Sequence, residues 1–264
     1  RPDGYHEIRT WIYPISLEDE LLIERVAPPR ITLSSSHPEL LLGEKNLAHR
    51  AAALFMKETG LLGGIKIEII KRIPLAAGLG GGSSDAATVL KAMNILWGTK
   101  IPPQGLMKIG EKIGADVPFF LLGKGAIMGG RGERLVKFLP PLKAWVVLIN
   151  PGLPLSTQNV YQMGKWGLTK DRRDNRILTL PQDLEKMDDF LHNDLEEPAL
   201  EFMPLIGGMK ERLRQVGARG VLMTGSGPTV FGLFSKEEEA SRATRDLKTE
   251  EGWTSFVAHT LSDS

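Results

Sequence analysis

The sequence predicts an α+β protein built in two parts. Segments with the two-residue alternation of strands are mixed with segments whose apolar residues have helical spacing. Two glycine-rich loops lie next to predicted strands, at residues 74–84 and 222–231. The residue composition changes near Pro151, after which a polar and charged stretch follows, so we place one part at residues 1–145 and the other at residues 146–264.

The first part is predicted to mix strands with helices. Ile65, Ile67 and Ile69 alternate with Lys66 and Glu68, which indicates a half-buried strand. Helical spacing and a proline-marked start favour helices at residues 46–59, 85–96 and 103–113. The other strands that we expect in this part are at residues 11–15, 21–26, 31–35, 126–128 and 135–138.

The second part is predicted to have the same mixed character. Strands are expected at residues 146–149, 221–223, 230–234 and 253–260. Helices are expected at residues 184–190, 195–202, 205–216 and 236–247. Residues 165–176, which read KWGLTKDRRDNR, are polar and charged, so we expect an exposed connection there.

Charge and composition exclude several classes of function. Lys and Arg number 33 against 32 Asp and Glu, so the net charge of +1 argues against nucleic acid or an anionic membrane as partner. The chain has no cysteine, which excludes disulfides and thiolate chemistry. No apolar run is long enough to span a membrane. The lack of cysteine fits a reducing cytosol. Our expectation is a cytoplasmic protein (in the plastid stroma if the source is eukaryotic), monomeric or homodimeric, with a small-molecule substrate.

The first glycine-rich loop has the features of a polyphosphate site. Its glycines permit positive φ and let backbone N–H groups surround an anion, and it runs into the N-terminus of a predicted helix. A plain strand-to-helix turn would need only one or two glycines, and no lysine follows as in a P-loop. The predicted site comprises Pro74, Leu75, Ala76, Ala77, Gly78, Leu79, Gly80, Gly81, Gly82, Ser83 and Ser84.

This loop, with Asp85 after it, reads P-x-x-x-G-L-G-G-G-S-S-D and resembles the ATP-binding loop of the GHMP kinases. The triple glycine is the form found in members that phosphorylate the C2 hydroxyl of a cytidine diphosphate-linked methylerythritol in non-mevalonate isoprenoid biosynthesis. The resemblance covers nearly the whole chain. It implies ATP and Mg²⁺ as cofactors, an N-terminal α+β domain with a left-handed βαβ unit, and a ferredoxin-like C-terminal domain.

A single carboxylate stands in the turn that reads G-A-D-V-P, at residues 114–118. By itself such a residue is most often a helix cap or a salt-bridge partner. The resemblance implies instead that Asp116 is the catalytic residue, which accepts the proton of the substrate hydroxyl while that oxygen attacks the γ-phosphate.

Two segments are expected to hold the substrate. The resemblance places Tyr5 and His6, in R-P-D-G-Y-H-E, at the cytidyl end, although either could be an incidental packing or turn residue. Tyr161 is expected either to stack on the cytosine or to pack in the core. The second glycine-rich loop is expected to close over the transferred phosphoryl group, or else to be a simple hairpin turn, and its candidates are Gly225, Ser226, Gly227 and Thr229.

Three weaker expectations concern the nucleotide site. Asn46 either hydrogen-bonds the adenine or caps the following helix. Ser84 is a candidate Mg²⁺ ligand, because the sequence shows no dedicated metal carboxylate. The segment H-N-D-L at residues 192–195 is interpreted as helix capping rather than chemistry.

One element of the family pattern does not occur in these 264 residues. The family begins with a strand that reads P-A-K-I-N-L, whose lysine pairs with the catalytic aspartate, and neither Lys45 nor Lys71 stands in a comparable context. We expect these residues alone to be weakly active or inactive. Two alternatives remain open: another GHMP enzyme, such as a homoserine or mevalonate kinase, and a non-catalytic nucleotide sensor or RNA-binding module of the same fold.

Overall fold

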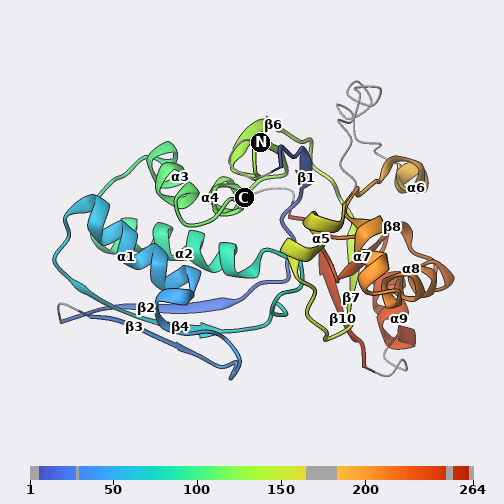
Figure 1. The fold of residues 1–264 in the computed structure, drawn as a ribbon, viewed down its shortest axis with the longest axis horizontal. Helices are drawn as coiled ribbons and strands as arrows, with labels where there is room; N and C mark the ends of the chain where they lie inside the picture. The colour runs from blue at the N-terminus through green and yellow to red at the C-terminus, as the bar shows by residue number, and fades with distance from the viewer. Residues whose placement is uncertain (1–5, 28–29, 165–182, 248–251, 262–264) are drawn as a thin grey trace.

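The computed structural model describes residues 6–27, 30–164, 183–247 and 252–261, and they form a mixed α and β structure as predicted (Figure 1). The connection predicted at residues 165–176 and the substrate candidate Tyr5 lie outside these ranges. Of the helices in the described ranges, none combines the length and apolarity that crossing a bilayer requires.

A three-stranded sheet supports the first glycine-rich loop. Its strands are β2 (Glu20–Val26), β4 (Gly64–Ile70) and β3 (Ile31–Ser35), in that order, with β4 antiparallel to β2 and parallel to β3. The parallel pair is joined through the short η1 (Gly43–Lys45) and α1 (Leu47–Thr59), which form the connection of a βαβ unit. Helices α1 and α2 (Gly81–Leu96) cover one face of this sheet (Figure 1).

The core between this sheet and its helices confirms the predicted alternation in β4. Ile65, Ile67 and Ile69 are fully buried, whereas Lys66 is exposed. They pack with Phe55 and other apolar side chains of α1 and α2. Burying an isoleucine side chain stabilises the fold by about 1.5–3 kcal/mol, so this row of side chains holds the strand that leads into the loop firmly in place.

A second sheet consists of β1 (Thr10–Ile12), β5 (Ala126–Gly129) and β6 (Arg134–Phe138). Strands β5 and β6 come after α3 (Pro103–Glu111) and α4 (Val117–Leu122) in the chain, and both helices pack near α2. The sequence did not predict α4, because six residues reading VPFFLL are too few to show helical spacing. Val117 is buried in the cluster that includes α2 and α3, Phe119 is buried against Ala126 and Met128 of β5, and this packing stabilises the short helix.

The second part of the chain forms a four-stranded antiparallel sheet. Its order is β10 (Thr254–His259), β7 (Trp145–Asn150), β9 (Val230–Phe234) and β8 (Arg219–Met223). In chain order this is fourth, first, third, second, the arrangement of the expected ferredoxin-like unit. The helical segments of this part are α5 (Thr157–Met163), η2 (Leu184–Lys186), α6 (Met187–Phe190), α7 (Glu196–Phe202), α8 (Leu205–Gln215) and α9 (Glu237–Leu247).

The two parts share a hydrophobic core and a backbone contact. Ile15 pairs with Thr260 beyond the end of β10, and the backbone N–H of Ser16 donates to the carbonyl of His259 at 2.9 Å. Leu79 of the first glycine-rich loop packs with buried Leu148 of β7 in the cluster between the parts. This packing holds the first loop against the second part of the molecule.

Candidate active site

The first glycine-rich loop leaves β4 and turns into α2 through left-handed backbone conformations. The φ angles are +50° at Ala76, +72° at Gly78 and +69° at Gly80. Helix α2 begins at Gly81, so the predicted start at Asp85 was four residues too late, because glycines hide a helical turn from propensity. The N-cap residue Gly80 has no side chain to accept from the first-turn amides, which leaves them open to an anion.

The run of predicted phosphate-binding residues reaches the surface. Only Ala77 and Ser83 within it are buried. The exposed members are Ala76 and Gly82, and those that are partly exposed are Pro74, Leu75, Gly78, Leu79, Gly80, Gly81 and Ser84. A ligand can therefore approach the loop from solvent.

The two glycine-rich loops touch each other. The hydroxyl of Thr224 donates a hydrogen bond to the carbonyl of Gly78 at 3.1 Å. A β-carbon at residue 78 would lie 2.7 Å from the carbonyl oxygens of both Thr224 and Gly227, so only glycine fits there. The second loop connects the antiparallel strands β8 and β9, so it is a hairpin. It also packs directly against the first loop at Gly78.

The candidates in the second loop have different surroundings. Gly225 and Gly227 have φ angles of +55° and +82°, and the hydroxyl of Ser226 shares a hydrogen bond of 2.8 Å with that of Thr157 in α5. Thr229 is completely buried, and its hydroxyl accepts from the side chain of Asn150 at 2.8 Å. Thr229 therefore supports the loop from the core. The sequence predicted that Thr229 would close over the phosphoryl group, but its buried side chain cannot face a ligand.

Asn193, which the sequence analysis considered only as part of a helix cap, holds the second loop in place through its side chain. The side-chain nitrogen of Asn193 donates to the carbonyls of Met223, at 2.9 Å, and Gly225, at 2.8 Å. Its side-chain oxygen accepts from the backbone N–H of Leu195 at 3.0 Å in the turn before α7, whereas the N-cap of α7 is Leu195, which has no side-chain cap hydrogen bond. Asn193 thus orders the turn before the helix, and an asparagine at this place in the sequence gives no sign of its contacts with the second loop.

Asp116 lies in the turn between α3 and α4, beside the N-terminus of α2. Its side chain does not cap α4, and within the described ranges no cation forms an ion pair with it, so neither alternative role is seen. A β-carbon at Gly114 in the same turn would lie 3.9 Å from the hydroxyl of Ser83, and one at Gly132 would lie 3.1 Å from the Asp116 carboxylate. Burial raises the pKa of Asp116 above its usual range.

Two aromatic rings lie next to this carboxylate. His6 and Tyr161 stack with ring centroids 5.4 Å apart and an interplanar angle of 26°. Burial raises the pKa of the Tyr161 phenol, and the negative charge of Asp116 raises it further, which places this ring near the carboxylate. Residues that are far apart in sequence are thus brought near one another, and Tyr161 belongs to α5, which Figure 1 shows between the two parts.

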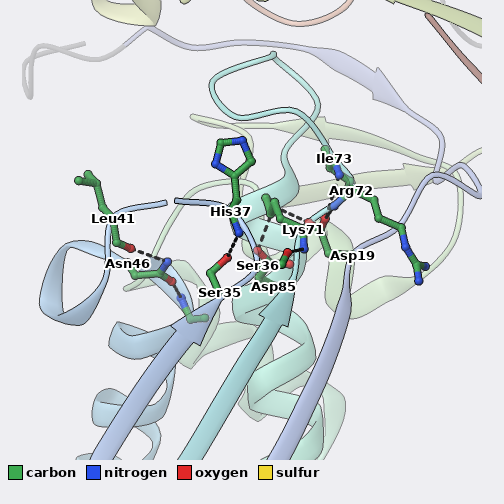
Figure 2. A network of polar contacts seen from close by, with 11 residues as sticks. Asp19, Ser35, Ser36, His37, Leu41, Asn46, Lys71, Arg72, Ile73 and Asp85 are labelled. Carbon is green, nitrogen blue, oxygen red and sulfur yellow. Dashed lines mark hydrogen bonds and ion pairs between the residues drawn. The ribbon is translucent and has the colours of Figure 1, made fainter. Parts of the chain in front are cut away.

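Asn46 acts as the N-cap of α1. Its side-chain oxygen accepts from the backbone of Ala48 at 2.8 Å, and its side-chain nitrogen donates to the carbonyl of Leu41 at 2.9 Å (Figure 2). The residue is 8% exposed. Of the two roles left open for Asn46, the structure shows the cap, with both polar atoms of the side chain engaged inside the chain.

A carboxylate cluster for a metal is not found. Within the described ranges, no group of three or more His, Asp or Glu side chains is placed to hold an ion. Ser84, which is partly exposed in the first turn of α2, is the candidate oxygen beside the phosphate loop. Such a site fits Mg²⁺ that is bound mainly by phosphates and water, because Mg²⁺ keeps much of its hydration shell in nucleotide sites.

Known proteins resemble this chain over nearly all of its length. The models of the GHMP kinases N terminal domain and the GHMP kinases C terminal region match residues 46–124 and 177–252. A 4-diphosphocytidyl-2-C-methyl-D-erythritol kinase of Syntrophotalea carbinolica is 43% identical, with 100% of this chain and 93% of that protein covered. A kinase of the same name from Geobacter metallireducens is 44% identical, with 96% and 89% covered.

The fold agrees with these sequence matches. A crystal structure of a 4-(cytidine 5'-diphospho)-2C-methyl-D-erythritol kinase superposes with a TM-score of 0.80 at 38% identity, covering 100% of this chain and 93% of that one. The chain therefore belongs to the GHMP kinases, in the family of the 4-diphosphocytidyl-2-C-methyl-D-erythritol kinases.

Proposed function

We propose that this chain transfers the γ-phosphoryl group of ATP to the C2 hydroxyl of 4-diphosphocytidyl-2-C-methyl-D-erythritol, a step of non-mevalonate isoprenoid precursor synthesis. The observation that carries the proposal is the position of Asp116. Gly114 of the same turn lies beside Ser83 in the first turn of α2, and the charge of the buried Asp116 carboxylate acts on Tyr161, which stacks on His6. The relatives with that name support the same substrate.

The triphosphate is proposed to bind along the first glycine-rich loop. The unoccupied first-turn amides of α2 and its helix dipole favour negative charge there. Gly78 and Gly80 permit close approach of the phosphates, and the second loop stands against this site through Thr224. Mg²⁺, when bound with the nucleotide, neutralises charge on the β- and γ-phosphates, and Ser84 is the residue proposed to contact it.

Asp116 is proposed to act as the general base. The C2 oxygen of the substrate forms a bond to the γ-phosphorus, the bond from that phosphorus to the bridging oxygen of ADP breaks, and the C2 proton passes to the carboxylate. Burial raises the pKa of Asp116, so its carboxylate is a stronger base than that of an exposed aspartate.

The cytidyl group is proposed to bind at the aromatic pair. A pyrimidine ring stacks on aromatic faces, and the imidazole of His6 offers a polar edge. The ring centroids of Tyr161 and His6 are 5.4 Å apart in a stacked geometry, and the charge of Asp116 acts on the Tyr161 phenol. This arrangement favours a substrate with a base at one end and an alcohol at the other.

The test is phosphorylation of a panel of alcohols by ATP. The panel contains 4-diphosphocytidyl-2-C-methyl-D-erythritol, the same alcohol without the cytidyl group, homoserine and mevalonate. The assay uses the 264 residues and a longer chain that adds the P-A-K-I-N-L strand of the family. We expect the longer chain to phosphorylate only the cytidyl substrate and the 264 residues to show weak activity or none. Preferential phosphorylation of homoserine or mevalonate would contradict the proposal.

A further inference from the structure

A lysine lies buried between two carboxylates next to the first glycine-rich loop (Figure 2). The ammonium of Lys71 donates to the carboxylates of Asp19 and Asp85, the latter at 3.1 Å. The three side chains are 3%, 2% and 4% exposed, in the order Lys71, Asp19 and Asp85. Buried ion pairs add little net stability, because desolvation offsets their attraction, so their main effect is to specify geometry.

The first carboxylate holds the segment that leads into the loop. The other oxygen of Asp19 accepts from the backbone N–H groups of Arg72, at 2.6 Å, and Ile73, at 2.9 Å. These two residues immediately precede Pro74, where the loop begins. The backbone of Lys71 itself donates to the hydroxyl of Ser36 at 2.9 Å. The exit from β4 is therefore fixed to the chain on both sides of that strand.

The second carboxylate holds the segment that leaves the loop. Asp85 lies near the N-terminus of α2 and is 3% exposed. A β-carbon at Gly81, the first residue of α2, would lie 3.0 Å from the Lys71 ammonium. The lysine thus packs directly against the start of the helix whose amides face the phosphate site.

We propose that Asp19, Lys71 and Asp85 are positioning residues for nucleotide binding, which hold both ends of the first glycine-rich loop at a set separation. The inference rests on the proposed role of this loop in binding ATP. A glycine-rich loop has many accessible conformations, and ordering it upon binding weakens affinity. A loop whose two ends are tied through one ammonium is ordered before the nucleotide arrives.

The charge of the group argues against direct phosphate binding by Lys71. With both carboxylates ionised, the ammonium is shared by two acceptors and one negative charge is in excess. A buried, doubly engaged ammonium offers little attraction to a polyphosphate. Lys71 therefore acts through the backbone that it positions.

The deciding comparison is between two substitutions at residue 85. Asp85→Ala removes the acceptor but leaves Lys71 paired with Asp19, and alanine suits a helix, so we expect this variant to fold. Asp85→Asn keeps an oxygen that accepts from Lys71. Affinity for a non-hydrolysable ATP analogue with Mg²⁺ is measured by calorimetry, without any alcohol. If loss of the Lys71–Asp85 contact leaves about a tenth of the molecules with the loop in its nucleotide-binding conformation, the dissociation constant of Asp85→Ala rises about tenfold. The dissociation constant of Asp85→Asn is expected to stay near that of the wild type.

A matched control lies at the other end of the same helix. The side chain of Asn94 donates to the carbonyl of Ile101 at 3.0 Å and accepts from its backbone N–H at 2.9 Å. Asn94→Ala removes a comparable tether far from the loop. We expect it to lower the melting temperature and leave affinity for the analogue unchanged. Asp85→Ser, which is also too short to reach Lys71, replaces Asp85→Ala if the alanine variant does not fold.

Three results would overturn the inference: wild-type affinity in Asp85→Ala, an equal loss in Asp85→Asn, or an equal loss in Asn94→Ala. The experiment is independent of the alcohol substrate. A longer chain with the P-A-K-I-N-L strand that binds the analogue but does not phosphorylate the cytidyl alcohol would contradict the proposed function and leave this comparison valid.

Discussion

The hydroxyl of Thr224 donates a hydrogen bond to the carbonyl oxygen of Gly78, a residue 146 positions earlier in the chain. Through this contact the two glycine-rich loops, one from each part of the molecule, form adjoining walls of one site. The close approach depends on Gly78, because the carbonyls of Thr224 and Gly227 occupy the space of a side chain.

Gly78→Ala is expected to damage nucleotide binding. The new methyl group would meet two carbonyl oxygens at 2.7 Å, at a φ of +72°, so the loops must separate. Gly98→Ala is the control, because Gly98 has a φ of +61° and open space around it. The left-handed conformation costs alanine about 1–2 kcal/mol at either site. We expect a similar or larger loss of stability at residue 78, and a loss of affinity for the ATP analogue at residue 78 only.

Asn193 is expected to stabilise the second loop through its donor group. Asn193→Asp keeps the acceptor for Leu195 but places a carboxylate oxygen against the carbonyls of Met223 and Gly225. Leaving these groups without a donor costs about 1–3 kcal/mol of unfolding free energy. Denaturant unfolding and the KM for ATP measure the effect, and Asp194→Asn, at an exposed neighbour, is the control. Equal stability of both variants would contradict the assigned role.

Asp116→Asn is expected to lower kcat by about 10²–10⁴-fold, with little change in affinity for the ATP analogue, because the amide cannot accept the proton. The carboxylate is the active form, and burial raises its pKa. In the parent enzyme, kcat/KM should therefore decline as the pH falls through a value above the usual aspartate pKa of about 4. A profile that stays flat down to that value would be inconsistent with a buried base.

Asp85 is expected to make stability depend on pH. Burial, and secondarily the negative charge of Asp19, raise the pKa of Asp85 to about 6, against the lowering effect of Lys71. The folded state then binds the proton more tightly than the unfolded chain does. The free energy of unfolding should fall by about 3 kcal/mol in total as the pH rises from about 3 to 7, with most of the fall between about 4 and 6.

Asp85→Asn should lack this fall, since it has no proton to lose at that position. Thermal or denaturant unfolding of both proteins across the pH range isolates the contribution of residue 85 from that of the other carboxylates. Parallel curves for the two proteins would show that Asp85 has an ordinary pKa.

Much of the fold could be predicted from local patterns. Ile65, Ile67 and Ile69 alternate with polar residues because one face of β4 is buried, and this period is visible in the sequence. The first turn of α2 and all of α4 could not be predicted. Glycine propensity hides the former, and the latter is too short to show a period and is stabilised by packing.

The sequence by itself determined the chemistry available to this protein: a glycine-rich loop for phosphate, a single carboxylate in a turn, and the family to which they belong. Only the tertiary structure decided which side chains meet. It placed Thr224 against Gly78 and Lys71 between Asp19 and Asp85, and it buried Thr229 in the core. The reason is physical, because contacts between residues far apart in the chain depend on how sheets and helices pack, and no local pattern encodes them.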